Sequence, residues 1–461
     1  VAEAIIDFLA QVEDFQKRLW EKKKFVVRTE YCLTIDRVPE ELWEEVLANE
    51  TQVAEWQKLY SIEGKVDKGL LKAHPTLVVD TRHFSEDFKW RLLAHFDDLD
   101  EALDGVLIKS ENWQALNLLL EKYREKVKCI YIDPPFNTGT NEFLYKNNYL
   151  DSSWITMMYD RLQVGRCMLA HDGSIYVRID YHGNHYIRMV MDYVFGKDYF
   201  GNEIVINRFR RQLGELTRFN VATDSLFYYT KSASPYFATV YRKRVCSFCG
   251  QEIERQWRPM SSPGLRHPPE RVVLGRELLP PKGRHWTFTQ KKIEAMEKES
   301  RIRINEGISY VDLAGNRVKG LPEYLQTEDT PVDSIWTDLK GYVFGSTFPT
   351  ENPEELIKRS LEVSSQEGDW VMDYFLGSGT TTAAAHKMRR KWIGVEMGNY
   401  FDTIVLTRMK EVLHGEQSGI SRDATWQGGG FFKYHHLEQY EDTLNNLELP
   451  REREGQSAFE T

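Results

Sequence analysis

Two short motifs, each closing a strand-like run, set the strongest limits on how this chain folds. Cys129-Ile130-Tyr131-Ile132 is apolar and partly β-branched, as buried strands are, and it leads into Asp133-Pro134-Pro135-Phe136. Far downstream, the run Trp370–Phe375 leads into the turn Gly377-Ser378-Gly379, and Thr380 opens an Ala-rich helix. Open α/β sheets bind ligands at the carboxyl ends of their strands. The motifs therefore predict a ligand site at that edge of an α/β sheet.

The first motif suits chemistry on an amino group. The adenine N6 amine is a poor nucleophile, because its lone pair is delocalised into the ring. A carboxylate at Asp133 and a backbone carbonyl, both accepting from that amine, would favour the pyramidal nitrogen that attacks a methyl group. Pro134 and Pro135 stiffen the turn and remove competing N–H donors, while Phe136 offers a face on which an extruded base gains ~1–3 kcal/mol by stacking. Taken alone, the motif fits a plain Pro-Pro turn after a core strand equally well.

The glycine turn predicts a site for S-adenosylmethionine. Gly377 and Gly379 let the backbone approach a ligand closely, and Asp373, Phe375 and Thr380 flank the turn. The dinucleotide fingerprint has a third glycine and cradles a pyrophosphate, a group that S-adenosylmethionine lacks. Glu396 ends the next strand-like run, Trp392–Glu396, where a carboxylate is placed to accept from both ribose hydroxyls. A βαβ unit without a nucleotide is the alternative interpretation.

Together these motifs resemble the β-group of DNA amino-methyltransferases, in which the catalytic half precedes the cofactor half. Within that group the chain is most similar to the modification subunits of type III restriction systems. The resemblance covers about Gly105 to Leu413 and is most specific over Asp133–Gly139 and Phe348–Glu396. It implies an α/β fold: a Rossmann-like, mixed seven-stranded sheet flanked by helices, permuted relative to other methyltransferases.

The resemblance also extends the set of cofactor residues. It implies cofactor contacts from Glu111 and Asn112, at a strand end that relatives write Gly-Asp-Asn, and from Asp133 itself. Thr350 and Pro353 match a segment that in relatives usually reads Thr-Glu-Lys-Pro. This chain departs from that pattern at Asn352, which stands in place of the usual lysine.

Pattern and composition divide the chain into five predicted parts. These are a mainly helical N-terminal lobe (1–104), the catalytic half (105–206), an inserted target-recognition region (207–342), the cofactor-binding half (343–412) and an acidic C-terminal tail (413–461). Helical spacing of apolar residues predicts helices over 39–47, 53–60, 111–125, 154–169 and 185–195. Alternation predicts a strand over 173–180, whose last residue, Asp180, is either a lining of the base pocket or a structural acid.

The charge is unevenly distributed. The formal net charge is −10, but residues 1–105 carry 14 basic and 23 acidic side chains, and residues 411–461 carry 4 and 10. The remainder is therefore basic, and residues 206–244 alone hold 8 basic and 2 acidic side chains. A basic centre between acidic flanks favours a track for double-stranded DNA in the inserted region. The predicted DNA-binding residues are Arg208, Arg210, Arg211, Arg218, Arg242, Lys243 and Arg244.

The cysteines and the apolar runs bear on metal binding and on the cellular compartment. Cys246 and Cys249 have the spacing of a zinc knuckle, but a structural zinc takes four ligands and no second such pair is present. The pair is thus either part of a zinc site or two reduced thiols in a loop. Five cysteines in 461 residues indicate a reducing cytoplasm. No apolar stretch approaches the ~20 residues that span a bilayer, and no signal-peptide pattern opens the chain.

The favoured function is a site-specific, S-adenosylmethionine-dependent DNA adenine-N6 methyltransferase of a restriction-modification or phage-defence system. Cytosine-N4 methylation is the nearest alternative, although enzymes of that kind more often have serine before Pro-Pro. An RNA or protein methyltransferase and a non-catalytic DNA-binding subunit are the other two hypotheses. The sequence shows no helicase or nuclease pattern, so any DNA cleavage is expected to come from a restriction, helicase or nuclease subunit. A homodimer is the other expected assembly.

Overall fold

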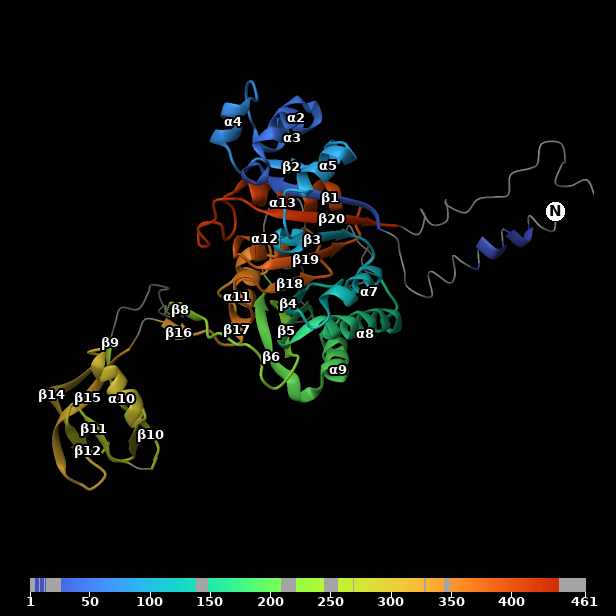
Figure 1. The fold of residues 1–461 in the computed structure, drawn as a ribbon. Helices are drawn as coiled ribbons and strands as arrows, with labels where there is room; N and C mark the ends of the chain where they lie inside the picture. Colours follow the sequence, from blue (N-terminus) through green and yellow to red (C-terminus); the bar gives the residue numbers. More distant parts are fainter. Residues whose placement is uncertain are drawn as a thin grey trace, which may run out of the picture. The chain divides into compact units, whose positions relative to one another are not determined.

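The chain folds into two compact units, Val1–Ala238 with Asp333–Thr461 and Thr239–Val332 (Figure 1). The computed structural model describes residues 5–7, 9–11, 13, 26–137, 148–208, 221–243, 256–267, 269–326, 329–343, 348 and 350–438. The second unit lies within the predicted insertion 207–342. Both ends of that insertion belong to the first unit, because they contribute strands to its sheet.

One mixed sheet of 11 strands runs through the first unit, in the order β17-β6-β7-β5-β4-β18-β19-β3-β20-β1-β2. Its middle part, β6 to β3, is the predicted seven-stranded sheet. These strands are β6 (Phe200–Asn207), β7 (Thr223–Thr230), β5 (Leu169–Ile179), β4 (Val127–Ile132), β18 (Trp370–Asp373), β19 (Lys391–Glu396) and β3 (Gly105–Lys109). β7 is antiparallel to β5 and β6, and the others pair in parallel. Because β18 lies beside β4, the predicted catalytic and cofactor halves meet at the centre.

Four more strands extend this sheet at its two ends. They are β17 (Ile335–Trp336) on one side and β20 (Phe431–Leu437), β1 (Val26–Thr34) and β2 (Val78–Asp80) on the other. β20 is parallel to β3 and antiparallel to β1. The segment predicted as an acidic tail thus contributes a strand, whose Phe431, Phe432 and Tyr434 are fully buried. Through β20 the N-terminal lobe joins the same sheet, so the expected boundaries at 104 and 413 do not separate compact units.

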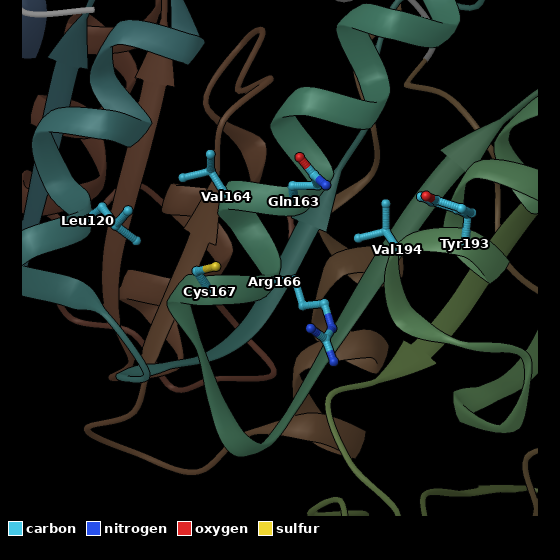
Figure 2. A pocket seen from close by; sticks show the side chains of 7 residues that line it. All are labelled: Leu120, Gln163, Val164, Arg166, Cys167, Tyr193 and Val194. Carbon is cyan, nitrogen blue, oxygen red and sulfur yellow. The ribbon is translucent and has the colours of Figure 1, made fainter. Parts of the chain in front are cut away.

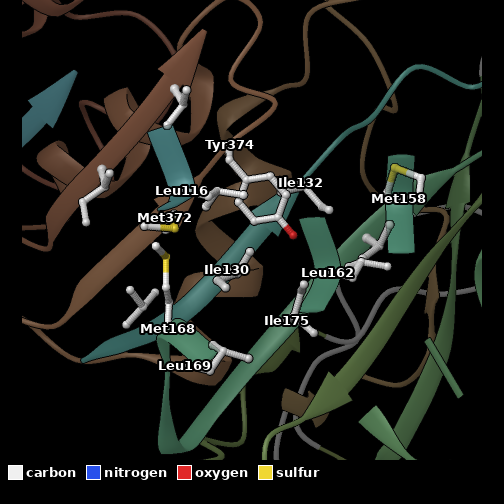
Figure 3. Packing of buried hydrophobic residues seen from close by; sticks show 14 of the residues in the cluster. Leu116, Ile130, Ile132, Met158, Leu162, Met168, Leu169, Ile175, Met372 and Tyr374 are labelled. Atoms are coloured by element: carbon white, nitrogen blue, oxygen red, sulfur yellow. The ribbon is translucent and has the colours of Figure 1, made fainter. Parts of the chain in front are cut away.

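Helices cover both faces of this sheet (Figure 1). On one face lie α7 (Asn112–Tyr123), α8 (Asp151–Met168) and α9 (Asn184–Phe195); on the other lie α11 (Glu354–Ser364), α12 (Thr380–Lys387) and α13 (Leu406–His414), preceded by a π-helical turn (Phe401–Val405). The helices predicted over 111–125, 154–169 and 185–195 are confirmed as α7, α8 and α9. Leu116, Met158 and Leu162 pack against Ile130, Ile175 and Met372 of the sheet in the core shown in Figure 3.

Short helices surround β1 and β2 and enclose a separate core. They are α2 (Trp43–Ala48), α3 (Glu50–Tyr60), α4 (Lys68–Ala73), α5 (Glu86–Leu93) and α6 (Leu99–Ala102). Lys410 of α13 connects this lobe to the sheet, because its buried ammonium pairs with Glu55 at 2.7 Å and Asp80 at 2.6 Å. Buried ions are tolerated when they are paired in this way.

The second unit is a small β-rich body with one described helix. Its strands are β8 (Tyr241–Lys243), β9 (Gln256–Pro259), β10 (Ser261–Pro263), β11 (Arg271–Val273), β12 (Arg276–Leu278), β13 (Arg284–Trp286), β14 (Ile302–Val311), β15 (Arg317–Gln326) and β16 (Asp329–Pro331), with the helix α10 (Gln290–Lys298). β14, β15 and β9 form its largest sheet. Met260, Trp286, Ile293 and Met296 are buried at its core.

The described helices include none whose length and hydropathy suit a membrane-spanning segment.

The position of β20 generates a stability prediction. Phe432 is fully buried, and its ring centroid lies 5.4 Å from that of Trp392 on β19. Phe432→Ala should lower the free energy of unfolding of the first unit by about 3–5 kcal/mol, because it leaves a cavity between β20 and the neighbouring core. Urea denaturation measures the change. Phe237→Ala, at a side chain 58% exposed, is the control and should change the free energy little. Equal effects of the two substitutions would contradict this account of β20.

Candidate active site

The carboxyl ends of β4 and β18 bring the two sequence motifs next to each other. Val371 and Met372 pair with Cys129 and Ile130, so Asp133 and Asp373 emerge at the same edge of the sheet. Burial raises the pKa of Asp373 to about 7, and the nearby Asp133 carboxylate also acts to raise it. Two carboxyl groups therefore lie close together in a largely dehydrated setting, where each makes ionisation of the other harder.

Asp133 has one oxygen held by the protein and one that is not. Its Oδ2 accepts a hydrogen bond of 2.8 Å from the amide nitrogen of Asn352. Its Oδ1 is buried and meets no hydrogen-bond partner among the described residues. Burial raises the pKa of Asp133 to about 6, against the opposing effects of the Arg178 guanidinium and the Asn352 hydrogen bond. At neutral pH this carboxylate is mainly ionised, and Oδ1 is an acceptor in need of a donor.

A buried ion network lies behind Asp133. Arg178 of β5 is fully buried and donates to Asp224 Oδ2 at 2.7 Å, to the Gly341 carbonyl at 2.8 Å and to the side-chain oxygen of Asn352. Its guanidinium lies 4.3 Å from the ring centroid of Tyr342, which in turn donates to Asp224 Oδ2 at 3.2 Å. No motif marks these residues in the sequence. The available signal is an arginine in the apolar run Ile175–Ile179.

The Pro-Pro turn is held in place by α8. The indole nitrogen of Trp154 donates to the Pro135 carbonyl at 2.8 Å. Asn137 adopts a positive φ of 56°, and its side-chain oxygen accepts from the backbone amide of Tyr149 at 2.7 Å. Phe136 is half-buried and packs against the edge of the main core. A turn braced at three points in this way keeps Asp133 in a defined position.

The glycine turn is held by carboxylates on either side. Gly377 and Gly379 have φ values of 58° and 91°, in the left-handed region that glycine tolerates best. Glu396 accepts from the backbone amides of Gly377 at 2.8 Å and Gly398 at 2.7 Å. Burial raises the pKa of Glu396, and these two amide donors oppose the rise. Glu396, predicted as a ribose acceptor, therefore also joins two loops of the site.

Asp373 anchors the other side of the same turn. Its two oxygens accept from the backbone amide of Phe375 at 2.9 Å and the hydroxyl of Thr381 at 2.6 Å. Gly394 of β19 lies below the turn, where a Cβ would come within 2.6 Å of Leu376 and 2.8 Å of Thr382. A side chain at 394 would therefore push the turn away from the sheet.

Arg408 is a further residue of this region that the sequence motifs did not indicate. From α13 it donates to Thr380 Oγ1 at 3.1 Å and to Ser378 Oγ at 3.3 Å, and it pairs with Glu354 at 3.1 Å and with Glu351. It thus connects the glycine turn to the segment that contains Asn352. The partners are distant in sequence, so no local pattern reveals this connection.

The remaining predicted cofactor residues lie around the same edge. Glu111 caps α7 by accepting from the Gln114 amide at 3.2 Å, and its carboxylate also pairs with Arg161. Asn112 donates to the carbonyl of Tyr374 at 2.8 Å and so contacts the cofactor half. Pro353 is buried at the start of α11, and Thr350 lies just before Glu351. Their contact with a cofactor stays a prediction.

The predicted DNA-binding arginines are only partly within the described residues. Arg208 pairs with Asp180 at 3.0 Å and with Asp224 at 3.4 Å, so its guanidinium is part of the buried network. Asp180 is fully buried and also accepts from His182, which favours its interpretation as a structural acid. Arg242 and Lys243 lie on β8 of the second unit. Outside the described residues lie Arg210, Arg211, Arg218 and Arg244, together with the predicted zinc ligands Cys246 and Cys249.

A separate cavity of about 370 Å³ lies among α7, α8 and α9 (Figure 2). Its lining residues are Leu120, Gln163, Val164, Arg166, Cys167, Tyr193 and Val194, and none of them belongs to the two motifs. Glu55, Asp80 and His83 form another cluster with metal-ligand atoms close together. Arg82 and Lys410 already neutralise its carboxylates, so the cluster is a salt-bridge network of the N-terminal lobe.

Comparisons with known proteins show which sequences this chain is similar to. A family model described as DNA methylase, of the N6 and N4 type, matches residues 127–406. The probable type III restriction-modification enzyme HindVI Mod subunit of Haemophilus influenzae is 28% identical over 417 residues, which cover 74% of this chain and 55% of the relative. The type II methyltransferase M.EcaI of Enterobacter cloacae is 28% identical over 328 residues, covering 66% of this chain and 69% of the relative.

Solved structures of lower similarity were also found. A PvuII DNA methyltransferase, described as cytosine-N4-specific, aligns with a TM-score of 0.39 at 13% identity, over 70% of this chain and 90% of that chain. The present chain spans about half the length of the HindVI Mod subunit.

Proposed function

Because this chain belongs to the DNA methylase family of the N6 and N4 type, we propose that it transfers a methyl group from S-adenosylmethionine to the N6 amine of adenine in DNA. One observation carries the proposal. The buried Oδ1 of Asp133 has no partner among the described residues and lies at the sheet edge where the glycine turn begins. A buried acceptor without a donor costs ~1–3 kcal/mol, which an N–H of the substrate would recover.

Asp133 acts on the amine through hydrogen bonding. Its Oδ1 accepts one N–H of the base, which draws the nitrogen lone pair out of conjugation and towards the incoming methyl carbon. As the new N–C bond forms, the methyl carbon would separate from the sulfur of the cofactor, which would keep the electron pair of the broken bond. The nitrogen would become cationic, and the same oxygen of Asp133 is placed to accept the proton that the nitrogen then loses. Phe136 supplies an apolar surface for the extruded base, whose removal from the stack costs a few kcal/mol. Trp154 keeps the turn, and therefore both groups, in position.

The residues present fit S-adenosylmethionine. The turn at Gly377 and Gly379 has positive φ at both glycines, so the backbone is open where a side chain would intrude. Phe348 packs beside Gly377, and Glu396 and Asp373 hold the turn from either side. When bound, S-adenosylmethionine supplies an electrophilic methyl group on its sulfonium. Gly377, Gly379, Thr380, Phe375, Asp373 and Glu396 would hold it, with Glu111, Asn112, Thr350 and Pro353 at the edge.

Adenine is preferred over cytosine on two grounds. The residue before Pro-Pro is Asp133, whereas cytosine-N4 enzymes more often have serine there. The relatives include Mod subunits of type III restriction-modification enzymes, the group to which the sequence motifs are most similar. Cytosine-N4 methylation is the second candidate, because the matching family model covers both kinds of amine.

The proposed setting is a restriction-modification system. The relatives named Mod subunits belong to such enzymes, and we infer that this chain modifies DNA in concert with a restriction subunit. The second unit, Thr239–Val332, lies within the predicted target-recognition insertion. We propose that this unit and the adjoining basic segment, with Arg242 and Lys243, contact the duplex. Phosphate contacts there would give affinity, and contacts to base edges would give sequence preference.

The first test is the pH dependence of methyl transfer. Activity, measured as labelled methyl groups transferred to DNA, should fall as the pH decreases through about 6, because protonation of Asp133 removes the acceptor. Asp133→Asn should reduce kcat by at least about 1000-fold, because an acceptor essential to the transition state is replaced by an amide whose NH2 opposes the amine. Asp423→Asn removes an exposed carboxylate paired with Lys358 and should leave the profile unchanged. Near-normal turnover by Asp133→Asn would exclude the mechanism.

A second test concerns the cofactor turn. Gly377→Ala should weaken S-adenosylmethionine binding by about 10-fold, because the substitution strains a backbone at φ 58° and shifts the turn. Gly368→Ala is the matched control: its φ is 82° and a Cβ there meets nothing within 4 Å, so it carries similar strain away from the site. Isothermal titration calorimetry measures both dissociation constants. If the two variants bind S-adenosylmethionine equally well, the cofactor lies elsewhere.

A further inference from the structure

We propose that Asn352 is a positioning residue that directs the free oxygen of Asp133 towards the target amine. This inference rests on the proposed function and deepens it. Asn352 lies between two charged groups of opposite sign, the guanidinium of Arg178 and the carboxylate of Asp133. The sequence motifs assigned no role to Asn352. They showed only that asparagine stands where relatives usually have lysine.

The orientation of the Asn352 amide is fixed by its two partners. Its oxygen accepts from Arg178 Nη1, and its nitrogen donates to Asp133 Oδ2 at 2.8 Å. Reversing the amide would place its NH2 against the guanidinium and its oxygen against the carboxylate, so that donor faces donor and acceptor faces acceptor. Arg178 is itself held by Asp224 and by the Gly341 carbonyl, so it cannot turn to follow another arrangement.

This fixed amide decides which oxygen of Asp133 is available. Oδ2 is occupied by Asn352, and the carboxylate plane is thereby held with Oδ1 unpaired. Without Asn352 the carboxylate would be free to rotate, and the two oxygens would exchange places. Methyl transfer requires the reacting atoms and the accepting oxygen to be aligned before the reaction. A carboxylate that is held in one orientation therefore raises the rate of methyl transfer.

The amide of Asn352 lies between the Asp133 carboxylate and the Arg178 guanidinium, so the cation does not contact the carboxylate through this bridge. A cation in direct contact would hold Asp133 strongly ionised and compete for its lone pairs. The charged and titratable groups that act on Asp133 or share its network are Arg178 of β5, Asp180 just after that strand, Asp224 of β7, Asp373 of β18, Arg208, Tyr131 and Tyr342. Asn352 thus fixes the orientation of Asp133 relative to Arg178 and adds no charge of its own.

The test compares two variants that break the bridge differently. Asn352→Leu keeps the approximate volume and removes both hydrogen bonds. Asn352→Asp keeps the acceptor for Arg178 but replaces the donor to Asp133 with a second carboxylate. Loss of a hydrogen bond to a charged group should lower kcat by about 10- to 100-fold in both variants. Removing the donor should raise the pKa of Asp133 and so move the acid limb of the pH profile of kcat to higher pH. The shift should be larger in Asn352→Asp, because two carboxyl groups then share the site.

Binding of S-adenosylmethionine without DNA separates positioning from structural damage. Its dissociation constant should stay within about threefold of the wild type, because a residue that acts on the chemical step leaves ground-state binding nearly unchanged. The control is Arg359→Ala, which removes the ion pair of α11 with Asp338 close to the same segment. This variant should leave the acid limb where it is in the wild type.

The outcomes are distinguishable. A wild-type chain without methyl transfer would overturn the proposed function itself. An active wild type whose acid limb does not move in Asn352→Leu or Asn352→Asp would overturn only the role of Asn352. An equal shift in Arg359→Ala would also contradict it, since general loosening of the segment would then explain the effect. If Asn352→Leu fails to fold, the profile of Asn352→Asp decides alone.

Discussion

The buried ion pair between Arg178 and Asp224 supports the rest of the site. Both side chains are fully shielded from solvent, and they lie on neighbouring strands, β5 and β7. Removing one partner of such a pair typically costs 3–5 kcal/mol, because the other charge is left buried and uncompensated. The pair is therefore kept in a single arrangement by its own energetics. Asn352 takes its orientation from Arg178, and Asp133 takes its orientation from Asn352.

The parallel pairing of β18 with β4 brings the two sequence motifs together. β4 and β18 are distant in sequence but adjacent and parallel in the sheet, so Asp133 and the glycine turn share one edge. Arg408 then connects the glycine turn to Glu351 and Glu354, on either side of the Asn352 segment. Asp133 and the glycine turn are thus linked through residues 351–354, because Asn352 bonds Asp133 while Glu351 and Glu354 pair with Arg408. A shift of residues 350–354 would therefore displace both Asp133 and the glycine turn.

Local patterns in the sequence predicted the helices and strands that position the two motifs. Asp133 and Gly377 follow strands that are recognisable from apolar runs, and α7, α8 and α9 follow from helical spacing. These features depend on neighbours in the chain, which the sequence shows directly. The seven-stranded part of the sheet followed from the resemblance to a known family, not from the residues alone.

The features that were missed depend on distant pairings. β20 was expected to be part of an acidic tail, because its partners β3 and β1 are hundreds of residues away and its apolar residues make only a short run. Arg208 was predicted to bind DNA from its charge, and its ion pairs with Asp180 and Asp224 were not foreseen. Arg178 and Arg408 carry no motif. In each case the sequence gives the charge or the hydropathy of a side chain but not its partner.

The most direct measurement is the identity of the methylated nucleoside. DNA incubated with the protein and isotopically labelled S-adenosylmethionine is digested to nucleosides, which are separated and identified by mass spectrometry. The account predicts that the label is found in N6-methyladenine and that Asp133→Asn incorporates none. Label in N4-methylcytosine would contradict the assignment to adenine. An absence of labelled nucleosides from DNA that carries the recognised site would contradict the central claim that the free oxygen of Asp133 serves an exocyclic amine.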